Sequence, residues 1–501
     1  MALLEMKHVW KTFGRVEANA DVSFSVEKGE VHALLGENGA GKSTLMNILY
    51  GLYKPTRGEI YFNGKQLNVR SPQDAIHVGI GMVHQHFMLI PALSVIENVI
   101  LGMEGNGLVL DRRKAAEAFL KMAEDYGMEI DPWAKVSSLS VGQQQRVEIL
   151  KALYRKASLL ILDEPTAVLT PQEVDALFVV IRKLKKDGMS IILISHKMHE
   201  IMAVCDKCTI LRQGHSIATM PVSKISSEAQ LAELMVGECV NLQTRKKKNE
   251  FGRTVVDLQD VSYLDKKKVP KLKHITFSIK KGQIVGIAGI DGNGQSELVK
   301  CITGLLHPTS GSVRLDGEDI ARLSARDILK KGISHIPEDR HNMGMVADMS
   351  VDENLILMNY HMPEYSKHGI LNRKKICEHN EGLVETYHVK TPDIHEKAGN
   401  LSGGNQQKMV VGRELDRKPE FLIAMHPDRG LDIGASKFIQ QRILDERERG
   451  TAILLVSTEL DEIMELSDEI VVLNSGEVMG RVKPEDTTRE QIGLMMVGVK
   501  E

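Results

Sequence analysis

Residues 36–44 have the residue types and spacing of a phosphate-binding loop. Glycines let consecutive backbone N–H groups wrap a phosphate, and the start of a following helix adds a favourable dipole. Lys42 can neutralise the charge of the β- and γ-phosphates of a nucleotide, and Ser43 can coordinate Mg²⁺. The full pattern GxxxxGK(S/T) is satisfied by Gly36, Glu37, Asn38, Gly39, Ala40, Gly41, Lys42, Ser43 and Thr44.

Two adjacent acids, Asp163 and Glu164, follow the apolar run 159–162. Such a pair is also common at ordinary strand ends, but beside a phosphate loop it has a clear use. Asp163 can hold Mg²⁺ through water, and Glu164 can orient or deprotonate the attacking water. The pair therefore favours hydrolysis of the bound nucleotide.

Two other polar residues carry a weaker signal. His196 ends the apolar run 191–195, at the edge of a parallel sheet where ligands bind, and from there it can reach a γ-phosphate. A lone histidine is nevertheless more often structural than catalytic. Gln85 is a neutral side chain in a loop and indicates nothing by itself.

Short apolar strands and helices must position these side chains. The phosphate loop follows the apolar run 31–35 and precedes an apolar helix at 45–50. Short runs such as 158–162 and 191–194 are typical of strands buried on both faces of a parallel sheet. The stretch 112–126, rich in Ala, Leu, Lys and Glu, predicts an inserted helical subdomain. The pattern as a whole predicts an α/β fold with a mainly parallel sheet.

The chain contains this unit twice. GEVHALLGENGAGKSTL at 29–45 matches GQIVGIAGIDGNGQSEL at 282–298, an offset of 253, whereas SLSVGQQQRVEI at 138–149 matches NLSGGNQQKMVV at 400–411, an offset of 262. The larger offset predicts a small insertion in the middle of the second repeat. A basic run at 245–248 without apolar periodicity predicts a solvated linker. We expect domains at 1–241 and 254–501, joined by a linker at 242–253.

The second repeat has lost the groups that would do the chemistry. Its replacements for the cation, the two acids, the glutamine and the histidine are Gln295, Met425, His426, Glu338 and Thr458. A thioether is a poor ligand for Mg²⁺, which prefers oxygen. The sequence therefore predicts a complete catalytic set in the first repeat and a second repeat that binds nucleotide weakly at most.

Composition excludes some classes of function. The 501 residues carry a formal net charge of −3, which gives no indication of general nucleic-acid binding. No run approaches the roughly 18 apolar residues of a membrane-spanning helix, and the first residues do not resemble a signal peptide. We expect a cytoplasmic protein; if it works at a membrane, other chains must form the pore.

In this order after a phosphate loop, Gln85, LSVGQ at 139–143, Asp163-Glu164 and His196 resemble the set that defines ABC ATPases, over nearly the whole chain and twice. The resemblance implies two tandem P-loop domains that bind ATP and Mg²⁺, each with a mainly parallel sheet, an antiparallel β subdomain and a helical subdomain. It makes Gln85 the residue that senses the γ-phosphate and Mg²⁺, His196 the switch histidine and Phe13 the ring that stacks on adenine.

The segment LSVGQ and its counterpart in the second repeat are called signatures in this family. The signature of the second repeat is better suited to approach a phosphate than that of the first. Ser402, Gly403 and Gly404 leave the backbone free to approach a phosphate closely, whereas the first repeat has Val141 at the position of Gly403. In the ABC family the two domains pack head to tail, so each signature caps the ATP of the opposite domain. The resemblance thus implies one competent site, made from the first phosphate loop and the second signature.

Among ABC proteins, the chain is most similar to the ATPase subunits of monosaccharide and nucleoside importers. GIGMVHQHFMLIP at 79–91, YGLYKPTRGEI at 50–60 and IPEDRHNMGMV at 336–346 resemble the nucleoside branch. Simple sugars are the alternative. The family implies two membrane permease subunits, an indirect link to an extracellular solute-binding protein, and a peripheral place on the cytoplasmic face of the cell membrane.

Two other classes fit less well. A ribosome-associated tandem ABC protein would keep two full catalytic sets and a long charged linker. A DNA-repair ATPase would carry zinc cysteines or a long coiled coil.

Overall fold

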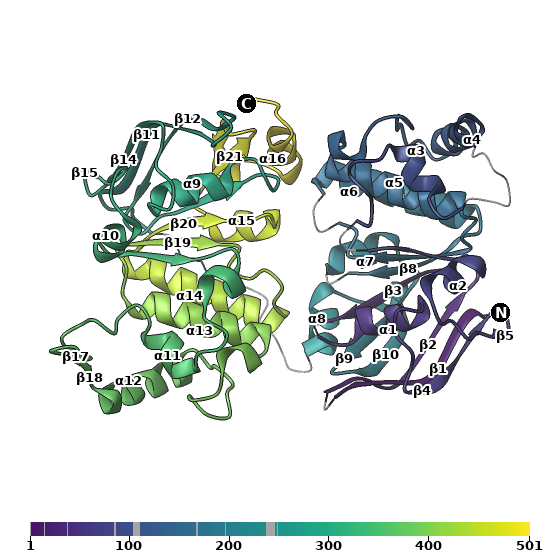
Figure 1. The fold of residues 1–501 in the computed structure, drawn as a ribbon, viewed down its shortest axis with the longest axis horizontal. Coiled ribbons are helices and arrows are strands. Elements are labelled where there is room, and N and C mark those ends of the chain that lie inside the picture. The colour runs from purple at the N-terminus through teal and green to yellow at the C-terminus, as the bar shows by residue number, and fades with distance from the viewer. Residues whose placement is uncertain are drawn as a thin grey trace. The chain divides into compact units, whose positions relative to one another are not determined.

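The computed structural model describes residues 2–14, 16–37, 39–84, 87–103, 111–166, 169–195, 197–236, 246–247 and 249–500. The chain divides into two compact units, Met1–Val240 and Asn241–Glu501, which we call unit 1 and unit 2. Each contains a four-stranded and a six-stranded sheet with a set of helices, and unit 2 has a further two-stranded sheet (Figure 1). Among the helices of the described residues, none has both the length and the apolar character needed to cross a membrane.

Unit 1 is built on a six-stranded sheet of order β10-β9-β3-β8-β7-β6, in which every neighbouring pair except β9–β10 is parallel. A second, antiparallel sheet has the order β2-β1-β4-β5. The strands are β1 (Ala2–Phe13), β2 (Val16–Glu27), β3 (Val31–Gly36), β4 (Arg57–Phe62), β5 (Lys65–Gln66), β6 (Ile80–Val83), β7 (Leu159–Asp163), β8 (Ser190–Ile194), β9 (Lys207–Arg212) and β10 (His215–Pro221).

The parallel sheet determines where the functional loops lie. Every residue of β3, β7 and β8 is buried, as expected for strands covered on both faces. Because β3, β8 and β7 are parallel neighbours, the loops that follow them meet at one edge of the sheet. The helices of unit 1 are α1 (Lys42–Leu49), α2 (Pro72–His77), α3 (Val95–Ile100), α4 (Arg112–Asp125), α5 (Val141–Tyr154), α6 (Pro171–Lys186), α7 (Met198–Val204) and α8 (Glu228–Val236).

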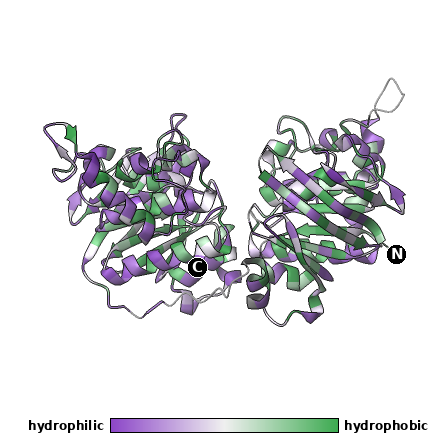
Figure 2. Cartoon of the chain, turned by 90° about the horizontal axis from the view of Figure 1, so that it is seen from below, coloured by the Kyte–Doolittle hydropathy of each residue, from purple (hydrophilic) through white to green (hydrophobic). Residues whose placement is uncertain are grey.

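The predicted subdomains are present. The antiparallel sheet packs its apolar face against one side of the parallel sheet, and α3, α4 and α5 contact one another as a helical subdomain. Asp111 begins α4 by accepting hydrogen bonds from the backbone N–H groups of Arg113 and Lys114. Figure 2 colours the same elements by hydropathy, and green apolar residues alternate with purple polar ones along the strands and helices.

Unit 2 repeats this plan, with a six-stranded sheet of order β16-β19-β20-β13-β21-β22 and an antiparallel sheet of order β12-β11-β14-β15. Its strands are β11 (Thr254–Leu264), β12 (Pro270–Lys280), β13 (Ile284–Ala288), β14 (Ser310–Leu315), β15 (Glu318–Asp319), β16 (Ile333–Ile336), β17 (Ser366–Lys367), β18 (Ile370–Leu371), β19 (Phe421–Met425), β20 (Ala452–Val456), β21 (Glu469–Asn474) and β22 (Glu477–Val482). Its helices are α9 (Gln295–Ile302), α10 (Ala325–Lys330), α11 (Val351–Ile356), α12 (Arg373–Thr386), α13 (Gly403–Asp416), α14 (Ile433–Arg449), α15 (Leu460–Leu466) and α16 (Arg489–Met496).

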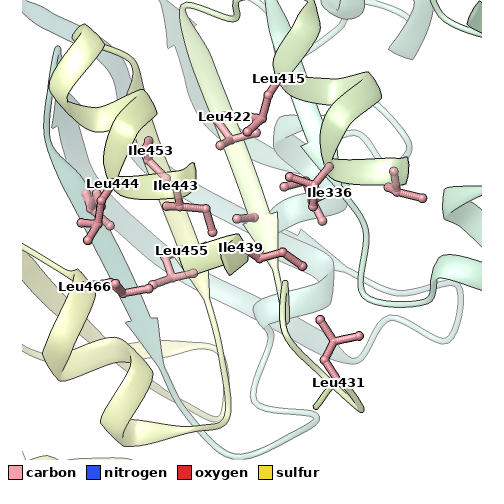
Figure 3. Close-up of a cluster of buried hydrophobic side chains, with 14 of the residues drawn as sticks. Ile336, Leu415, Leu422, Leu431, Ile439, Ile443, Leu444, Ile453, Leu455 and Leu466 are labelled. Atoms are coloured by element: carbon pink, nitrogen blue, oxygen red, sulfur yellow. The ribbon is translucent and has the colours of Figure 1, made fainter. Parts of the chain in front are cut away.

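The main core of unit 2 lies between its parallel sheet and the helices on one side of it. Figure 3 shows Leu422 of β19 and Ile453 of β20 facing Ile443 of α14, all of them fully buried. These contacts hold the strands, and with them the loops at their carboxyl ends, in fixed positions.

The extra residues of the second repeat are spread over three places, not one. By the starts of matching elements, three lie between β16 and α11, five between α11 and α12, and one before α13. The first group forms a π-helical turn at Arg340–Gly344, and the second accommodates the β17–β18 hairpin.

The basic run expected to be solvated is partly docked on unit 2. Lys246 forms an ion pair with Asp468 at 3.1 Å, and only 25% of its side chain is exposed. Lys247 pairs with Glu448 at 2.7 Å, while its carbonyl oxygen accepts a hydrogen bond from Arg447. These acids and Arg447 could not be assigned to the linker from sequence, because the fold alone brings them together.

Candidate functional site

Lys42 is fixed at the start of α1 by its own loop. Its Nζ donates hydrogen bonds to the carbonyl oxygens of Gly36 at 2.6 Å and Glu37 at 2.9 Å. Burial lowers the pKa of Lys42, and the nearby carboxylates of Glu164 and Asp163 oppose that effect. The ammonium is therefore a buried cation held at the centre of the phosphate loop.

The loop requires glycine for steric reasons. Gly41 has φ 98°, a left-handed conformation that side chains disfavour, and a Cβ there would lie 2.5 Å from the amide nitrogen of Asn19. Gly39 has φ 82°. The backbone can adopt this tight path around a phosphate only because neither position carries a side chain.

Ser43 and Asp163 form an oxygen pair suited to Mg²⁺. The Ser43 hydroxyl donates a hydrogen bond to the Asp163 carboxyl. Burial, together with the neighbouring Glu164 charge, raises the pKa of Asp163 to about 6, while Lys42 and Ser43 act in the opposite direction. A divalent cation would relieve this crowding of buried negative charge, and hard oxygen donors are what Mg²⁺ prefers. The residues present fit the ion.

Glu164 stands on a strained backbone. Its φ is 46°, which is uncommon for a residue other than glycine, and its N–H donates to the Ile194 carbonyl oxygen at 2.9 Å. The turn begins directly at the end of β7, on the same sheet edge as the phosphate loop. The structure thus places both acids on the edge that carries Lys42.

Phe13 lies at the end of β1 with 42% of its surface exposed. Tyr53 meets it edge to face, with ring centroids 5.2 Å apart, and Lys11 Nζ lies 4.8 Å from the Phe13 centroid. The sequence did not indicate Tyr53 or Lys11 as part of this site. Tyr53 follows α1, forty residues after Phe13, and the two rings come into contact only in the folded unit. By strand register, in which Val9 of β1 matches Val261 of β11, the position in unit 2 that corresponds to Phe13 is Asp265, so that position carries no aromatic ring.

Some predicted site residues lie outside the described part of the chain. These are Asn38, Gln85 and His196. Of the remaining loop residues, Glu37, Gly39 and Ala40 lie between β3 and α1, and Thr44 lies in the first turn of α1.

A groove of about 260 Å³ is lined in part by His84 and Met88, which flank Gln85 in the sequence. Its lining combines apolar residues with Glu148, Lys151 and Arg155 of α5 and the region after it. Met88 borders it and is 65% exposed, whereas Phe87 is half-buried against the core of unit 1. Phe87 therefore has a structural role that the sequence left open.

The matching edge of unit 2 has the same backbone with different side chains. Gln295 Nε2 donates to the Ile290 carbonyl oxygen at 3.1 Å, where Lys42 would bond. The Ser296 hydroxyl donates to Glu338 at 3.1 Å, and Arg429 pairs with the same carboxylate at 3.3 Å. Met425 and His426 are buried, and burial lowers the pKa of His426. The acid Glu338 thus occupies a place where a phosphate loop needs positive charge.

The two signature helices start differently. In unit 1, the Ser140 hydroxyl accepts a hydrogen bond from the Gln143 N–H, and the Gln143 side-chain oxygen accepts one from the Ser140 N–H. In unit 2, no side chain of the described residues caps α13 at Ser402. Asn405 instead donates to the Ser402 hydroxyl and accepts from the Lys390 N–H. The first backbone N–H groups of α13 are therefore left without a side-chain acceptor.

A buried pair of acids distinguishes unit 2. In unit 1, buried Glu200 accepts hydrogen bonds from the hydroxyls of Thr166 and Ser195. In unit 2, Glu462 takes the place of Glu200 and Asp428 that of Thr166. Burial raises the pKa of both carboxyls, and the neighbouring Asp428 raises that of Glu462 further.

Comparison with known proteins agrees with this geometry. Residues 20–167 and 272–427 match a family model described as ABC transporter. The chain is 48% identical over 497 residues to a nucleoside import ATP-binding protein, NupA of Lactococcus lactis subsp. cremoris, covering 99% of this chain and 98% of that protein. It is 46% identical over 497 residues to a guanosine import ATP-binding protein, NupO of Bacillus subtilis, covering 99% and 97%. A glucose import ATP-binding protein of Haloferax volcanii is 44% identical over 528 residues, covering 99% and 96%.

Proposed function

Since the chain belongs to the ABC transporter family and is one of its ATP-hydrolysing proteins, we propose that it powers the uptake of nucleosides through separate membrane permease subunits. The observation that carries this proposal is the full-length similarity, at 46–48% identity, to two proteins named for nucleoside or guanosine import. The proposal also takes the protein to be peripheral to the cytoplasmic face of the membrane and indirectly linked to a solute-binding protein.

In the proposed mechanism, unit 1 performs the hydrolysis. Lys42 and the backbone N–H groups of residues 36–44 bind the β- and γ-phosphates, and Phe13 stacks on adenine, supported by Tyr53. Ser43 and Asp163 hold Mg²⁺, together with Gln85. The ion neutralises charge on the phosphate oxygens when bound.

Glu164 orients the attacking water and accepts its proton. Its carboxylate lies near enough to Lys42 to act on the pKa of that ammonium, which supports a place beside the phosphate loop. His196 contacts the γ-phosphate in this proposal, and Gln85 links its state to the permease. Ser402, Gly403 and Gly404 of unit 2 cap the same nucleotide, a pairing that rests on the head-to-tail arrangement of the family.

Cells that lack this chain provide the test of substrate. We expect uptake of a labelled nucleoside to be abolished and uptake of labelled ribose, galactose and glucose to be unchanged. Restoring the chain should return nucleoside uptake, and restoring it with Lys42→Ala should not. Loss of sugar uptake with retention of nucleoside uptake would assign the protein to the sugar importers, an alternative supported by the 44% identity to the glucose import protein.

A further inference from the structure

The β17–β18 hairpin of unit 2 places an apolar side chain in solvent. It belongs to the extra residues between α11 and α12 and lies at the outer edge of unit 2, beside α12 (Figure 1). Ile370 is 76% exposed, the highest value among the large apolar side chains of the described residues. A single exposed apolar residue is ordinary, so its surroundings decide what it indicates.

The hairpin holds Ile370 in a fixed position. Ile370 pairs with Lys367 across a two-residue turn. The next residue, Leu371, has its side chain on the opposite face of the strand and packs against a small buried cluster. The members of that cluster are Ile356, Tyr365 and Ile376. Because the hairpin is anchored in this way, Ile370 is already ordered, and a contact there costs little further conformational entropy.

Basic side chains surround this apolar residue. The ten residues 366–375 contain four basic side chains and no acidic one, although the whole chain has a net charge of −3. The basic residues are Lys367, Arg373, Lys374 and Lys375, and all four are exposed. The last three begin α12, at the end of the helix where the dipole disfavours positive charge, so they do not stabilise the helix. Lys374 lies 3.9 Å from Glu378 with 87% of its side chain exposed, and neither Arg373 nor Lys375 forms an ion pair with another described residue.

The corresponding helix of unit 1 has similar residues in a different setting. Helix α4 also begins with three basic residues, at 112–114, but Asp111 directly precedes them. Arg112 forms an ion pair with Glu97 at 2.6 Å. The residue that precedes α12 is instead the neutral Asn372. Positive charge is therefore partly neutralised in unit 1, whereas in unit 2 it is largely unopposed and lies beside an exposed apolar side chain.

An exposed apolar side chain among cations is suited to the surface of an anionic bilayer. Each Lys or Arg near such a surface strengthens binding about fivefold through attraction to lipid phosphates. The apolar side chain enters the boundary between headgroups and acyl chains. A stable protein interface needs a buried area on the order of 1,000 Å², far more than a hairpin with one exposed apolar side chain offers. Lipids have no such requirement, because they rearrange around the side chain.

We propose that the β17–β18 hairpin and the start of α12 contact the anionic lipid surface of the membrane, with Ile370 inserted between headgroups and the four basic side chains bound to lipid phosphates. The inference rests on the proposed function only in that it requires the protein to work at a membrane. It adds a direct lipid contact of unit 2 to the attachment through permease subunits.

Vesicles without permease test this contact directly. The full chain should sediment with vesicles of phosphatidylcholine and phosphatidylglycerol in equal amounts, and much less with phosphatidylcholine alone. Higher salt should weaken the binding, because it screens the attraction between charges. Ile370→Ser should lower the affinity about tenfold, since no apolar side chain is then removed from water. Arg373→Gln combined with Lys375→Gln should lower it roughly tenfold or more.

Arg113→Gln combined with Lys114→Gln is the matched control, because it removes two cations from the start of α4 in unit 1. This control should bind vesicles like the unsubstituted protein, and every variant should keep its ATPase rate and thermal midpoint. Absence of binding to the anionic vesicles would overturn the proposal, as would equal losses in the control and in the variants of unit 2. Normal nucleoside uptake without vesicle binding would leave the proposed function intact.

Two other occupants of the hairpin would give different results. If the hairpin contacts a permease subunit, Ile370→Ser should reduce co-purification with the permease and leave vesicle binding unchanged. If it contacts a second copy of this chain, the same substitution should change the sedimentation coefficient in the absence of lipid. Either result would overturn the proposal.

Discussion

Units 1 and 2 share a backbone and differ in chemistry. Glu164 and His426 have φ values of 46° and 45°, and their N–H groups donate to matching carbonyl oxygens of Ile194 and Val456. Gly41 and Gly294 start their helices with φ 98° and 105°. The strained turns have persisted in a unit whose cation and acids are gone. Packing of the sheet and its helices therefore preserves the geometry, whereas the side chains at the positions of the cation and the acids differ.

The signature segments show the opposite contrast between the two units. Unit 1 combines a complete phosphate loop with a capped signature that carries Val141, and unit 2 combines a deficient loop with an open signature beside Arg340. In each unit, the departures from the pattern of the other fall in the parts that the proposed site does not use.

The largest expected effect is on the ATPase rate, and it distinguishes the phosphate loop of unit 1 from that of unit 2. Lys42→Ala should reduce the ATPase rate by about 10²–10⁴-fold, because the transferred phosphoryl group loses its buried cation. Gln295→Lys should create no second activity, because Met425 and His426 still provide neither a metal ligand nor a base. Steady-state ATPase assays of both variants test this. Substantial activity in Lys42→Ala that Gln295→Ala removes would reverse the roles of the units.

A comparable loss of ATPase activity is expected for a substitution in the signature of unit 2, but not for the same substitution in the signature of unit 1. Ser402→Arg places a bulky cation at the open start of α13 and should reduce ATPase activity nearly as much as Lys42→Ala does. Ser140→Arg, although in the unit with the intact loop, should cost much less. Rates measured side by side decide between them. A severe Ser140→Arg and a mild Ser402→Arg would mean that the proposed pairing of loop and signature is wrong.

A smaller effect is expected at the groove beside the Gln85 segment. Met88→Ala removes an exposed apolar side chain and should lower transport several-fold while the isolated chain keeps its ATPase rate and thermal midpoint. Phe87→Ala is the contrasting variant, because that ring packs on the core and its loss should lower the thermal midpoint. Transport in vesicles, measured together with ATPase activity, tests this. Unchanged transport in Met88→Ala would argue against permease contact there.

The smallest effect concerns the acid pair. Burial raises the pKa values of Asp428 and Glu462 above those of the unfolded chain. The free energy of unfolding is therefore unaffected by these groups below the unfolded pKa values near pH 4, and it falls as pH rises toward the pKa values of the folded protein. Asp428→Thr, which copies unit 1, should raise the free energy of unfolding by roughly 1–3 kcal/mol at pH 8 and less at pH 5. Ser457, Gln440 and Glu459, which also face the pair, are left unchanged.

The matched control for the acid pair is Thr166→Asp in unit 1. It introduces a carboxyl beside buried Glu200 and should destabilise that unit, more at pH 8 than at pH 5. Thermal melts at several pH values measure both variants. A gain from Asp428→Thr that is independent of pH would show that ionisation of the pair does not affect the free energy of unfolding.

The sequence predicted the parts of the site that are contiguous in the chain. The phosphate loop, the paired acids and the apolar strands that carry them are local patterns, and the structure places Lys42, Ser43, Asp163 and Glu164 on one sheet edge. Gln85, His196 and Asn38 lie outside the described residues, so their roles remain predictions.

Contacts between distant segments could not be predicted in this way. Tyr53 meets Phe13, and Arg340 meets Gly403, only because sheets and helices bring them together. The repeat offset gave the size of the insertion in unit 2, but not its division into three places or the π-helical turn it forms. The docking of Lys246 depends on Asp468, which lies over two hundred residues away in sequence.

The contact between Gly403 and Arg340 bears on exchange of sequence between the two repeats. Copying the first signature onto the second would place valine at position 403, with its Cβ 2.8 Å from Arg340 Nη2. The flexible guanidinium would have to move away from the first turn of α13, so the two signatures are not interchangeable without a change in their surroundings.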